Sequence, residues 1–210
     1  VAAMAALRSS APASSSAVFA LAMRNYRGKG HPQNRREAAL LFHLAADQGH
    51  AQAQSNFTDW LLEEGNYAEA TRYYRLAADQ GHAQAQYNCG SCYYNGVGLA
   101  ADQIEGARYY RLAADQGIPS AQFNVALCFS AGEGVPQSHI DAAHYHRLAV
   151  DLGHMEAQFN LANAYSQGMG VLQNHGEAVR YYRLAADQGD KAAQQNLGTG
   201  FASQPTRALI

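Results

Sequence analysis

A five-residue phrase, Ala-Ala-Asp-Gln-Gly, recurs along this chain at a nearly fixed spacing. It occupies residues 45–49, 77–81, 113–117 and 185–189, and a degenerate copy, Ala-Val-Asp-Leu-Gly, occupies residues 149–153. The offsets from copy to copy are 32, 36, 36 and 36 residues. A fixed period in this range is typical of stacked supersecondary units, each of which contacts its neighbours. The phrase therefore predicts an elongated array and not a domain with one closed core.

One repeat, residues 83–118, contains two helical patterns. Small or apolar residues at Ala85, Cys89, Cys92 and Tyr93 share one face of a first helix, which the Gly-Val-Gly at 96–98 ends. A second helix follows and ends at the glycine of the recurrent phrase. Its predicted buried stripe is Gly106, Tyr109, Tyr110, Ala113 and Ala114. The unit is therefore predicted to be an antiparallel helix pair.

Each predicted second helix begins with two capping residues three positions apart. In such a capping box, each of the two side chains accepts a backbone N–H at the helix start. The pairs are Asn34/Glu37, Asn66/Glu69, Asp102/Glu105, Ser138/Asp141 and Asn174/Glu177. Their regular spacing predicts the start of every second helix.

The repeat boundaries divide the chain into segments. Five helix pairs are predicted at residues 15–50, 51–82, 83–118, 119–154 and 155–190, and residues 191–198 supply a partial sixth. The second pair is four residues short, and the shortfall lies in its inter-helix loop, Glu64-Gly65-Asn66. Residues 1–14 are predicted to be a disordered, linker or targeting-like segment, and residues 199–210 a C-terminal tail.

Composition excludes several classes of function. The net charge is −2 and charged residues make up 15% of the chain, which argues against a general nucleic-acid or anionic-membrane surface. No apolar stretch is long enough for a transmembrane helix, so no membrane span is expected. Three cysteines, Cys89, Cys92 and Cys128, cannot form a closed set of disulfides. This count favours a reducing compartment such as the cytoplasm; the sequence gives no other indication of localisation.

The repeat resembles a known family. The pattern A-x-x-N-[LVC]-[GA]-x-x-[YF]-x-x-G-x-G-V, followed by a capped helix with A-x-x-Y-Y-x-x-A-A-x-x-G, is similar to the Sel1-like repeat, an α/α repeat related to tetratricopeptide repeats. The resemblance covers roughly residues 15–198 and is clearest at residues 156–190. It implies an all-α fold, a right-handed α/α superhelical solenoid of antiparallel helix pairs. It also implies a non-catalytic adaptor or scaffold that binds a protein or peptide partner and uses no cofactor.

Polar residues recur on one side of the predicted first helices, at positions 2, 6, 9 and 13 of the repeats. Because first helices line the concave side of tandem helix-pair stacks, this stripe is the candidate partner-binding surface. The predicted partner-binding residues are Asn56, Asp59, Asn88, Ser91, Asn95, Asn124, Leu127, Glu156, Asn160, Asn163 and Gln167.

Two interpretations of the recurrent asparagine at position 6 stay open. A row of amides can hold an extended peptide backbone, since each amide both donates and accepts hydrogen bonds. The same amides can instead bond to the adjacent helix and fix the stacking of repeats. The aromatic residues that precede them, Tyr87, Phe123 and Phe159, are either hydrophobic anchors or packing residues, and Trp60 occupies a predicted core position.

No enzymatic site is predicted. Cys89-Gly-Ser-Cys92 spells C-x-x-C but lacks the strand-to-helix setting of redox motifs, and both cysteines fall on the predicted buried stripe. The nine histidines form no metal-ligand set with the required spacing. We therefore predict no catalytic residue, no metal site and no cofactor.

The alternatives are an interaction or regulatory segment of a larger enzyme, such as a kinase or ubiquitin-ligase complex, and a secreted hydrolase of the family's cysteine-rich subgroup. That subgroup places one cysteine in each helix of a repeat, whereas no second helix here contains one.

Overall fold

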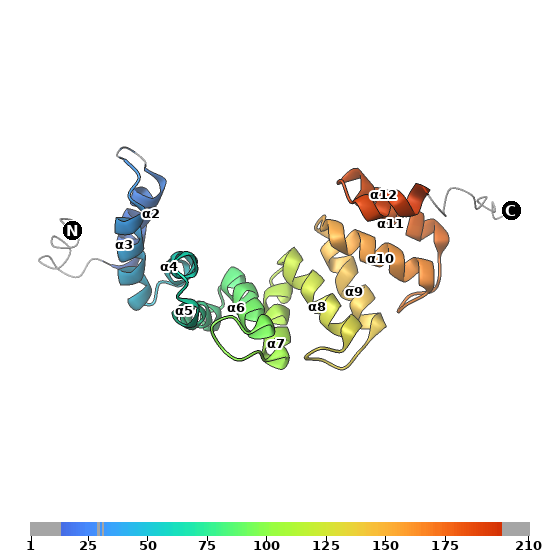
Figure 1. Ribbon diagram of the computed structural model, residues 1–210, viewed down its shortest axis with the longest axis horizontal. Coiled ribbons are helices and arrows are strands. Elements are labelled where there is room, and N and C mark those ends of the chain that lie inside the picture. Colours follow the sequence, from blue (N-terminus) through green and yellow to red (C-terminus); the bar gives the residue numbers. More distant parts are fainter. Residues whose placement is uncertain (1–13, 29, 31, 199–210) are drawn as a thin grey trace, which may run out of the picture. The chain divides into compact units, whose positions relative to one another are not determined.

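The computed structural model describes residues 14–28, 30 and 32–198, and every regular element in these ranges is a helix (Figure 1). The predicted all-α class is confirmed. The predicted N-terminal segment, except Ser14, and the predicted tail at 199–210 lie outside the described residues. The chain divides into two compact units, residues 1–102 and residues 103–210.

In the first unit, each helix packs against the next one along the chain, as successive antiparallel rods (Figure 1). The helices are α2 (Ser15–Arg27), α3 (Arg35–Asp47), α4 (Ala51–Glu63), α5 (Tyr67–Asp79) and α6 (Ala83–Asn95). Large apolar side chains such as Leu41, Phe42, Phe57 and Leu61 are buried between these helices, and many small alanines bring the backbones close together. Burial of this apolar surface is the main force that holds each helix to its neighbours.

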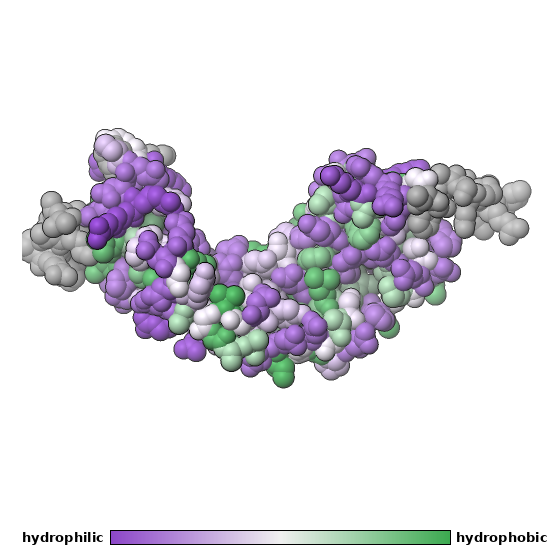
Figure 2. All heavy atoms as spheres, in the orientation of Figure 1, coloured by the Kyte–Doolittle hydropathy of each residue, from purple (hydrophilic) through white to green (hydrophobic). Residues whose placement is uncertain are grey.

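The second unit repeats this arrangement, and again each helix packs on the next. The helices are α7 (Gln103–Asp115), α8 (Pro119–Ala131), α9 (His139–Asp151), α10 (Met155–Gln167), α11 (His175–Asp187) and α12 (Lys191–Asn196). Leu161, Tyr181 and Tyr182 belong to its buried core. Figure 2 shows hydrophilic residues over most of the visible surface of each unit, with hydrophobic residues in small separate groups. No described helix has the length and apolar content that a membrane crossing requires.

A buried glutamine in the first helices holds the end of the preceding second helix. The Nε2 atoms of Gln54, Gln86 and Gln122 donate to the carbonyl oxygens of Ala46, Ala78 and Ala114, at 3.1, 3.1 and 3.3 Å. The last carbonyls of a helix have no partner inside the helix, and each of these three also accepts the N–H of the glycine that ends the recurrent phrase. The glutamine adds a second hydrogen bond, which ties the first helix to the end of the preceding second helix. The glutamine recurs eight residues after the second alanine of the phrase, so its spacing is a sequence signal for this contact.

Three recurrent histidines begin the first helices that follow them. The Nδ1 atoms of His50, His82 and His154 accept the backbone N–H groups of the residues three positions later, at 3.2, 3.2 and 3.4 Å. At the last of these helix starts, Asp190 accepts the N–H of Ala193 instead. These residues are N-caps, and their recurrence reflects helix capping.

The predicted capping boxes are half correct. The side chains of Asn34, Ser138 and Asn174 accept N–H groups three residues later, as expected. The reciprocal half is wrong, because their own backbone N–H groups donate to carbonyls nine residues earlier, in the last turn of the preceding first helix. Asn66 departs from the predicted capping box in a different way. In its shortened loop the N–H of Asn66 donates to Leu61, and its side chain donates to Glu69 instead of accepting a helix N–H.

The longer loops pack on the first turn of the preceding second helix. Gly98 has φ +74°, and a Cβ atom there would overlap the carbonyl oxygen of Tyr67, so only glycine fits. No loop of this length follows α4, since that loop is four residues short. Trp60, predicted as a core residue, is accordingly only half buried, whereas Cys92 and Cys128 at the same repeat position are buried.

Candidate partner-binding site

The predicted partner-binding residues lie at the surface of the first helices, half-buried or exposed. Some of them line two cavities. In the second unit, Leu127, Asn160, Asn163 and Gln167 line one cavity, and in the first unit Asn56 and Asp59 line another. The remaining residues line neither of these two cavities: Asn88, Ser91, Asn95, Asn124 and Glu156.

A tyrosine of the second helices connects two positions of the predicted stripe. The hydroxyl of Tyr74 donates to Oδ1 of Asp59 at 2.9 Å, and the side chain of Asn88 hydrogen-bonds the same hydroxyl. Burial raises the pKa of Tyr74 and also that of Asp59. The hydroxyl therefore keeps its proton and donates. Asn88 is thus used to fix the stacking of α5 on α6, which is the structural interpretation of the asparagine row.

The same arrangement recurs at the end of the second unit. The hydroxyl of Tyr182 donates to Oδ1 of Asn163 at 2.6 Å and is hydrogen-bonded by Asn196. These polar groups are removed from bulk water, so each bond also prevents the cost of an unpaired buried atom.

In the fourth repeat, His146 replaces the tyrosine, so these hydrogen bonds to a hydroxyl group are not formed. It occupies the position of Tyr74 and Tyr182, is only 4% exposed, and its Nδ1 atom has no hydrogen-bond partner within the described residues. The position of Asp59 and Asn163 is held here by Leu127, which cannot accept a hydrogen bond. Asn160, in the position of Asn88, makes no side-chain hydrogen bond in the part of the chain that the structure describes. Two polar side chains are therefore free to bind a ligand.

Both side chains line one cavity of about 270 Å³ between α8, α9 and α10, which we name the His146 cavity. The polar residues His146, Asn160, Asn163 and Gln167 line part of it, while Leu127 and Met169 supply half-exposed apolar side chains. The other residues that line it are Ser130, His139, Ala142, Ala143 and Ala164. A cavity of this composition suits an amphipathic side chain with one polar end.

Electrostatics keep the imidazole of His146 neutral near pH 7. Burial, and to a smaller extent the nearby His154, lower the pKa of His146 to about 4. Phe123 packs against both rings, with centroid distances of 5.7 Å to His146 and 4.7 Å to His154. A neutral imidazole has one N–H donor and one acceptor nitrogen. Phe123, one of the possible anchors, is a packing residue that holds this histidine in place.

The cavity in the first unit is about 220 Å³ and is lined by Asn56 and Asp59 together with Met23, Tyr26 and Trp60. Its polar side chains already have partners. Asn56 accepts from Gln52 at 3.0 Å and donates to the sulfur of Met23 at 3.3 Å, and Asp59 accepts from Tyr74. This cavity therefore offers a ligand fewer free hydrogen-bonding atoms than the His146 cavity does.

The cysteines and acidic residues show no arrangement for catalysis or metal binding among the described residues. Cys89, Cys92 and Cys128 are buried and form no disulfide within the described residues, and burial raises the pKa of Cys92 and, to about 11, that of Cys128. The thiolate, which is the nucleophile, is thus disfavoured at these two positions. No group of three or more histidine, cysteine, aspartate or glutamate side chains within the described ranges is placed to hold a metal ion.

Comparison with known protein families decides the identity of these repeats. A family model described as the Sel1 repeat matches residues 15–50, 61–82, 83–118, 119–154 and 156–190. The chain belongs to the Sel1 repeat family. Proteins built from Sel1 repeats are generally non-catalytic scaffolds for protein interactions. A comparison with curated proteins finds no significant match.

Solved structures of other Sel1 repeat proteins share the fold. A protective antigen of uropathogenic Escherichia coli strains, with an SLR fold, is 31% identical and superposes with a TM-score of 0.83 over 88% of this chain. The chain spans 40% of the length of that antigen. A Sel1 repeat protein from Oxalobacter formigenes is 30% identical, with a TM-score of 0.78 over 87% of this chain and 74% of its own. The predicted family and the helical-repeat solenoid are confirmed.

Proposed function

We propose that this Sel1 repeat protein is an adaptor that binds an extended segment of a partner polypeptide along the face formed by its first helices. The His146 cavity receives one side chain of that segment. The observation that carries this proposal is the buried Nδ1 atom of His146, which has no partner in the part of the chain that the structure describes and lines the same cavity as the equally unpartnered amide of Asn160. An unpaired buried polar group costs about 1–3 kcal/mol, and a bound ligand can recover this cost.

The lining of the cavity indicates which side chain it accepts. A neutral side chain that both donates and accepts can bond to the imidazole and to the amide, while its aliphatic part contacts Leu127 and Met169. Glutamine combines these properties. Asn124, one repeat before Asn160, also makes no side-chain hydrogen bond within the described ranges, so it can hold the backbone of the same segment.

A binding experiment tests this proposal without a known partner. A random peptide library is selected against the protein, and the best peptide is titrated by calorimetry into the wild type and into a variant with Asn124→Ala and Asn160→Ala. We expect at least about tenfold weaker binding, equal to 1.4 kcal/mol, with little change in thermal unfolding. Leu172→Ala, in a side chain that is 91% exposed, serves as the control. Equal affinity for wild type and double variant would contradict the proposal.

A second hypothesis is that these repeats form the interaction segment of a larger enzyme. In this hypothesis the partner-binding surface is the same, but the repeats are part of the same polypeptide as a catalytic domain. The sequence on either side of residues 1–210 tests this alternative directly, because a catalytic domain in the same polypeptide would support it and a further run of repeats alone would not.

A further inference from the structure

Each of the longer inter-helix loops packs against the first turn of the preceding second helix, on a surface that we call the loop seat. In the first unit, Gly98 lies against the carbonyl group of Tyr67 and the backbone of Ala68, and Thr71 donates a hydrogen bond to the carbonyl oxygen of Val97 at 2.8 Å. In the second unit, Gly134 lies against Gln103 and Ala107 in the same way, and Gly170 lies against His139. Three loops thus use one mode of contact.

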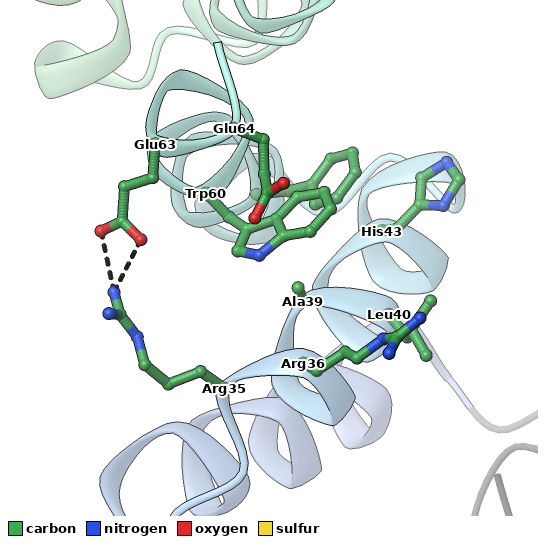
Figure 3. A pocket seen from close by; sticks show the side chains of 9 residues that line it. Arg35, Arg36, Ala39, Leu40, His43, Trp60, Glu63 and Glu64 are labelled. Atoms are coloured by element: carbon green, nitrogen blue, oxygen red, sulfur yellow. Dashed lines mark hydrogen bonds and ion pairs between the residues drawn. The ribbon is translucent and has the colours of Figure 1, made fainter. Parts of the chain in front are cut away.

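No such loop covers the equivalent loop seat on α3 within the described residues. The residues that correspond to Tyr67, Ala68 and Thr71 are Arg35, Arg36 and Ala39, and the short loop at 64–66 does not extend over them. They line a cavity of about 730 Å³ together with residues of α3 and α4 (Figure 3). We name it the loop-seat cavity. Its remaining residues are Leu40, His43, Phe57, Trp60, Glu63 and Glu64.

Packed side chains hold the loop-seat cavity open. The rings of His43 and Phe57 stack with centroids 4.7 Å apart, and Phe57 stacks on Trp60 at 5.6 Å. Figure 3 shows the indole of Trp60 extending between α4 and α3, with the ion pair of Arg35 and Glu63 on one side of it. That pair joins the two helices at 2.8 Å. The shape is therefore formed before any partner binds.

We propose that the loop-seat cavity receives a glycine-containing turn of another polypeptide, which takes the place of the missing loop. Glycine is required where the turn meets the carbonyl of Arg35, for the reason that Gly98 is required at Tyr67. An adjacent small aliphatic side chain packs on Trp60. Arg36 makes no ion pair or hydrogen bond within the described residues, so its guanidinium can donate to a carbonyl of the turn.

A second folded copy of this chain does not supply the turn from these loops. Gly98, Gly134 and Gly170 are already seated within their own units. Gly30, in the loop before α3, is not seated in this way, since an added Cβ there meets nothing within 4 Å. We assign the occupant to a separate partner whose exposed turn resembles the loop at 96–102, and self-association of the protein through the turn at Gly30 would contradict this assignment. This site is separate from the His146 cavity, so the two proposals can fail independently.

The only tryptophan of the chain, Trp60, lines the cavity and reports on its occupation. The probe is a cyclised peptide with the sequence of residues 95–102, Asn-Gly-Val-Gly-Leu-Ala-Ala-Asp. We expect a saturable change in tryptophan emission as this peptide is added. A matched peptide with alanine in place of its second glycine should bind at least about tenfold more weakly, because its Cβ atom meets the Arg35 carbonyl. Equal binding of the two peptides, or no response at about 1 mM peptide, would overturn the proposal.

Two variants extend the test. Ala39→Thr places a hydroxyl where Thr71 donates to the loop of the next repeat, and should tighten binding about threefold, in line with the net contribution of one hydrogen bond. Replacement of residues 64–66 by the seven-residue sequence of 96–102 should fill the seat from within the chain and abolish binding. If this loop variant does not fold, the two peptides and Ala39→Thr still decide the result. Unchanged affinity in Ala39→Thr would count against a loop-like bound state.

Discussion

His146 occupies the position that Tyr182 holds one repeat later, but the two side chains differ in what they bind. Tyr182 donates a hydrogen bond to Asn163 at 2.6 Å, whereas the Nδ1 atom of His146 has no partner within the described residues. The shorter ring also leaves a cavity beside Leu127 and Asn160. A single departure from the repeat pattern thus changes a packing position into a candidate binding site.

The protonation of His146 makes the stability of the protein depend on pH. Its pKa of about 4 in the folded chain lies below the ordinary value of 6.5, so the unfolded chain takes up the proton first as the pH falls. The stability contributed by the neutral ring is complete above pH 6.5 and is lost between pH 6.5 and 4. The loss amounts to about 3 kcal/mol.

His146→Tyr removes this titration and restores the residue type of the neighbouring repeats. We expect the free energy of unfolding of the variant, relative to wild type, to rise by about 2 kcal/mol or more between pH 7 and pH 4.5. Urea unfolding at the two pH values measures this difference, and other titrating groups cancel in the comparison. A pH dependence identical to that of wild type would show that His146 is not held neutral.

Two asparagines at equivalent positions should differ in their effect on stability. Asn88 hydrogen-bonds the buried hydroxyl of Tyr74, so Asn88→Ala should lower the free energy of unfolding by about 1 kcal/mol. Asn160 has no such bond, and Asn160→Ala should change it by less than about 0.5 kcal/mol. Chemical denaturation of both variants tests whether the asparagine row is uniformly structural, which would give equal losses.

The contact between Tyr74 and Asp59 should appear as a coupling energy. Tyr74→Phe and Asp59→Ala remove the two ends of one hydrogen bond of 2.9 Å. A double-mutant cycle on unfolding free energy should give a coupling of about 1 kcal/mol. Strictly additive effects would mean that the bond contributes nothing to the packing of α4 on α5.

The seat of the long loop can be tested with two glycines of the first unit. Gly98 and Gly81 have similar positive φ values, +74° and +85°, but only Gly98 has neighbouring atoms within 4 Å of an added Cβ. Gly81→Ala should cost about 1–2 kcal/mol for backbone conformation alone. Gly98→Ala should cost about 1–3 kcal/mol more, because the loop must move away from Tyr67. Equal losses in thermal unfolding would contradict the close contact.

The sequence was sufficient to predict the helix pairs, because period, capping residues and apolar stripes all agree at the same positions. The buried stripe of residues 106–114 and the N-cap asparagines Asn34 and Asn174 are found as expected. The loss of the reciprocal capping bonds could not be predicted, since the competing carbonyls lie in the last turn of the preceding first helix and meet the N-cap residue only through the path of the loop between them.

The candidate sites depend on deviations from the repeat and not on the repeat itself. The row of asparagines suggested one continuous surface, but their hydrogen bonding differs from repeat to repeat. Asn88 bonds to Tyr74, whereas Asn124 and Asn160 make no side-chain hydrogen bond within the described residues. Trp60 looked like a core residue since its repeat position is buried elsewhere, yet the four missing loop residues leave it half-exposed. A comparison of the residue types at these positions between neighbouring repeats could have identified both the His146 cavity and the loop-seat cavity.

Nuclear magnetic resonance of the protein with a library-selected peptide tests the central claim most directly. The signals to follow are the side-chain amide of Asn160 and the imidazole nitrogens of His146, before and after saturation with the peptide. We predict that both shift strongly while the signal of Asn88, which is bonded to Tyr74, moves little. Saturating binding that leaves the resonances of Asn160 and His146 unchanged would show that the partner binds elsewhere and would contradict the account.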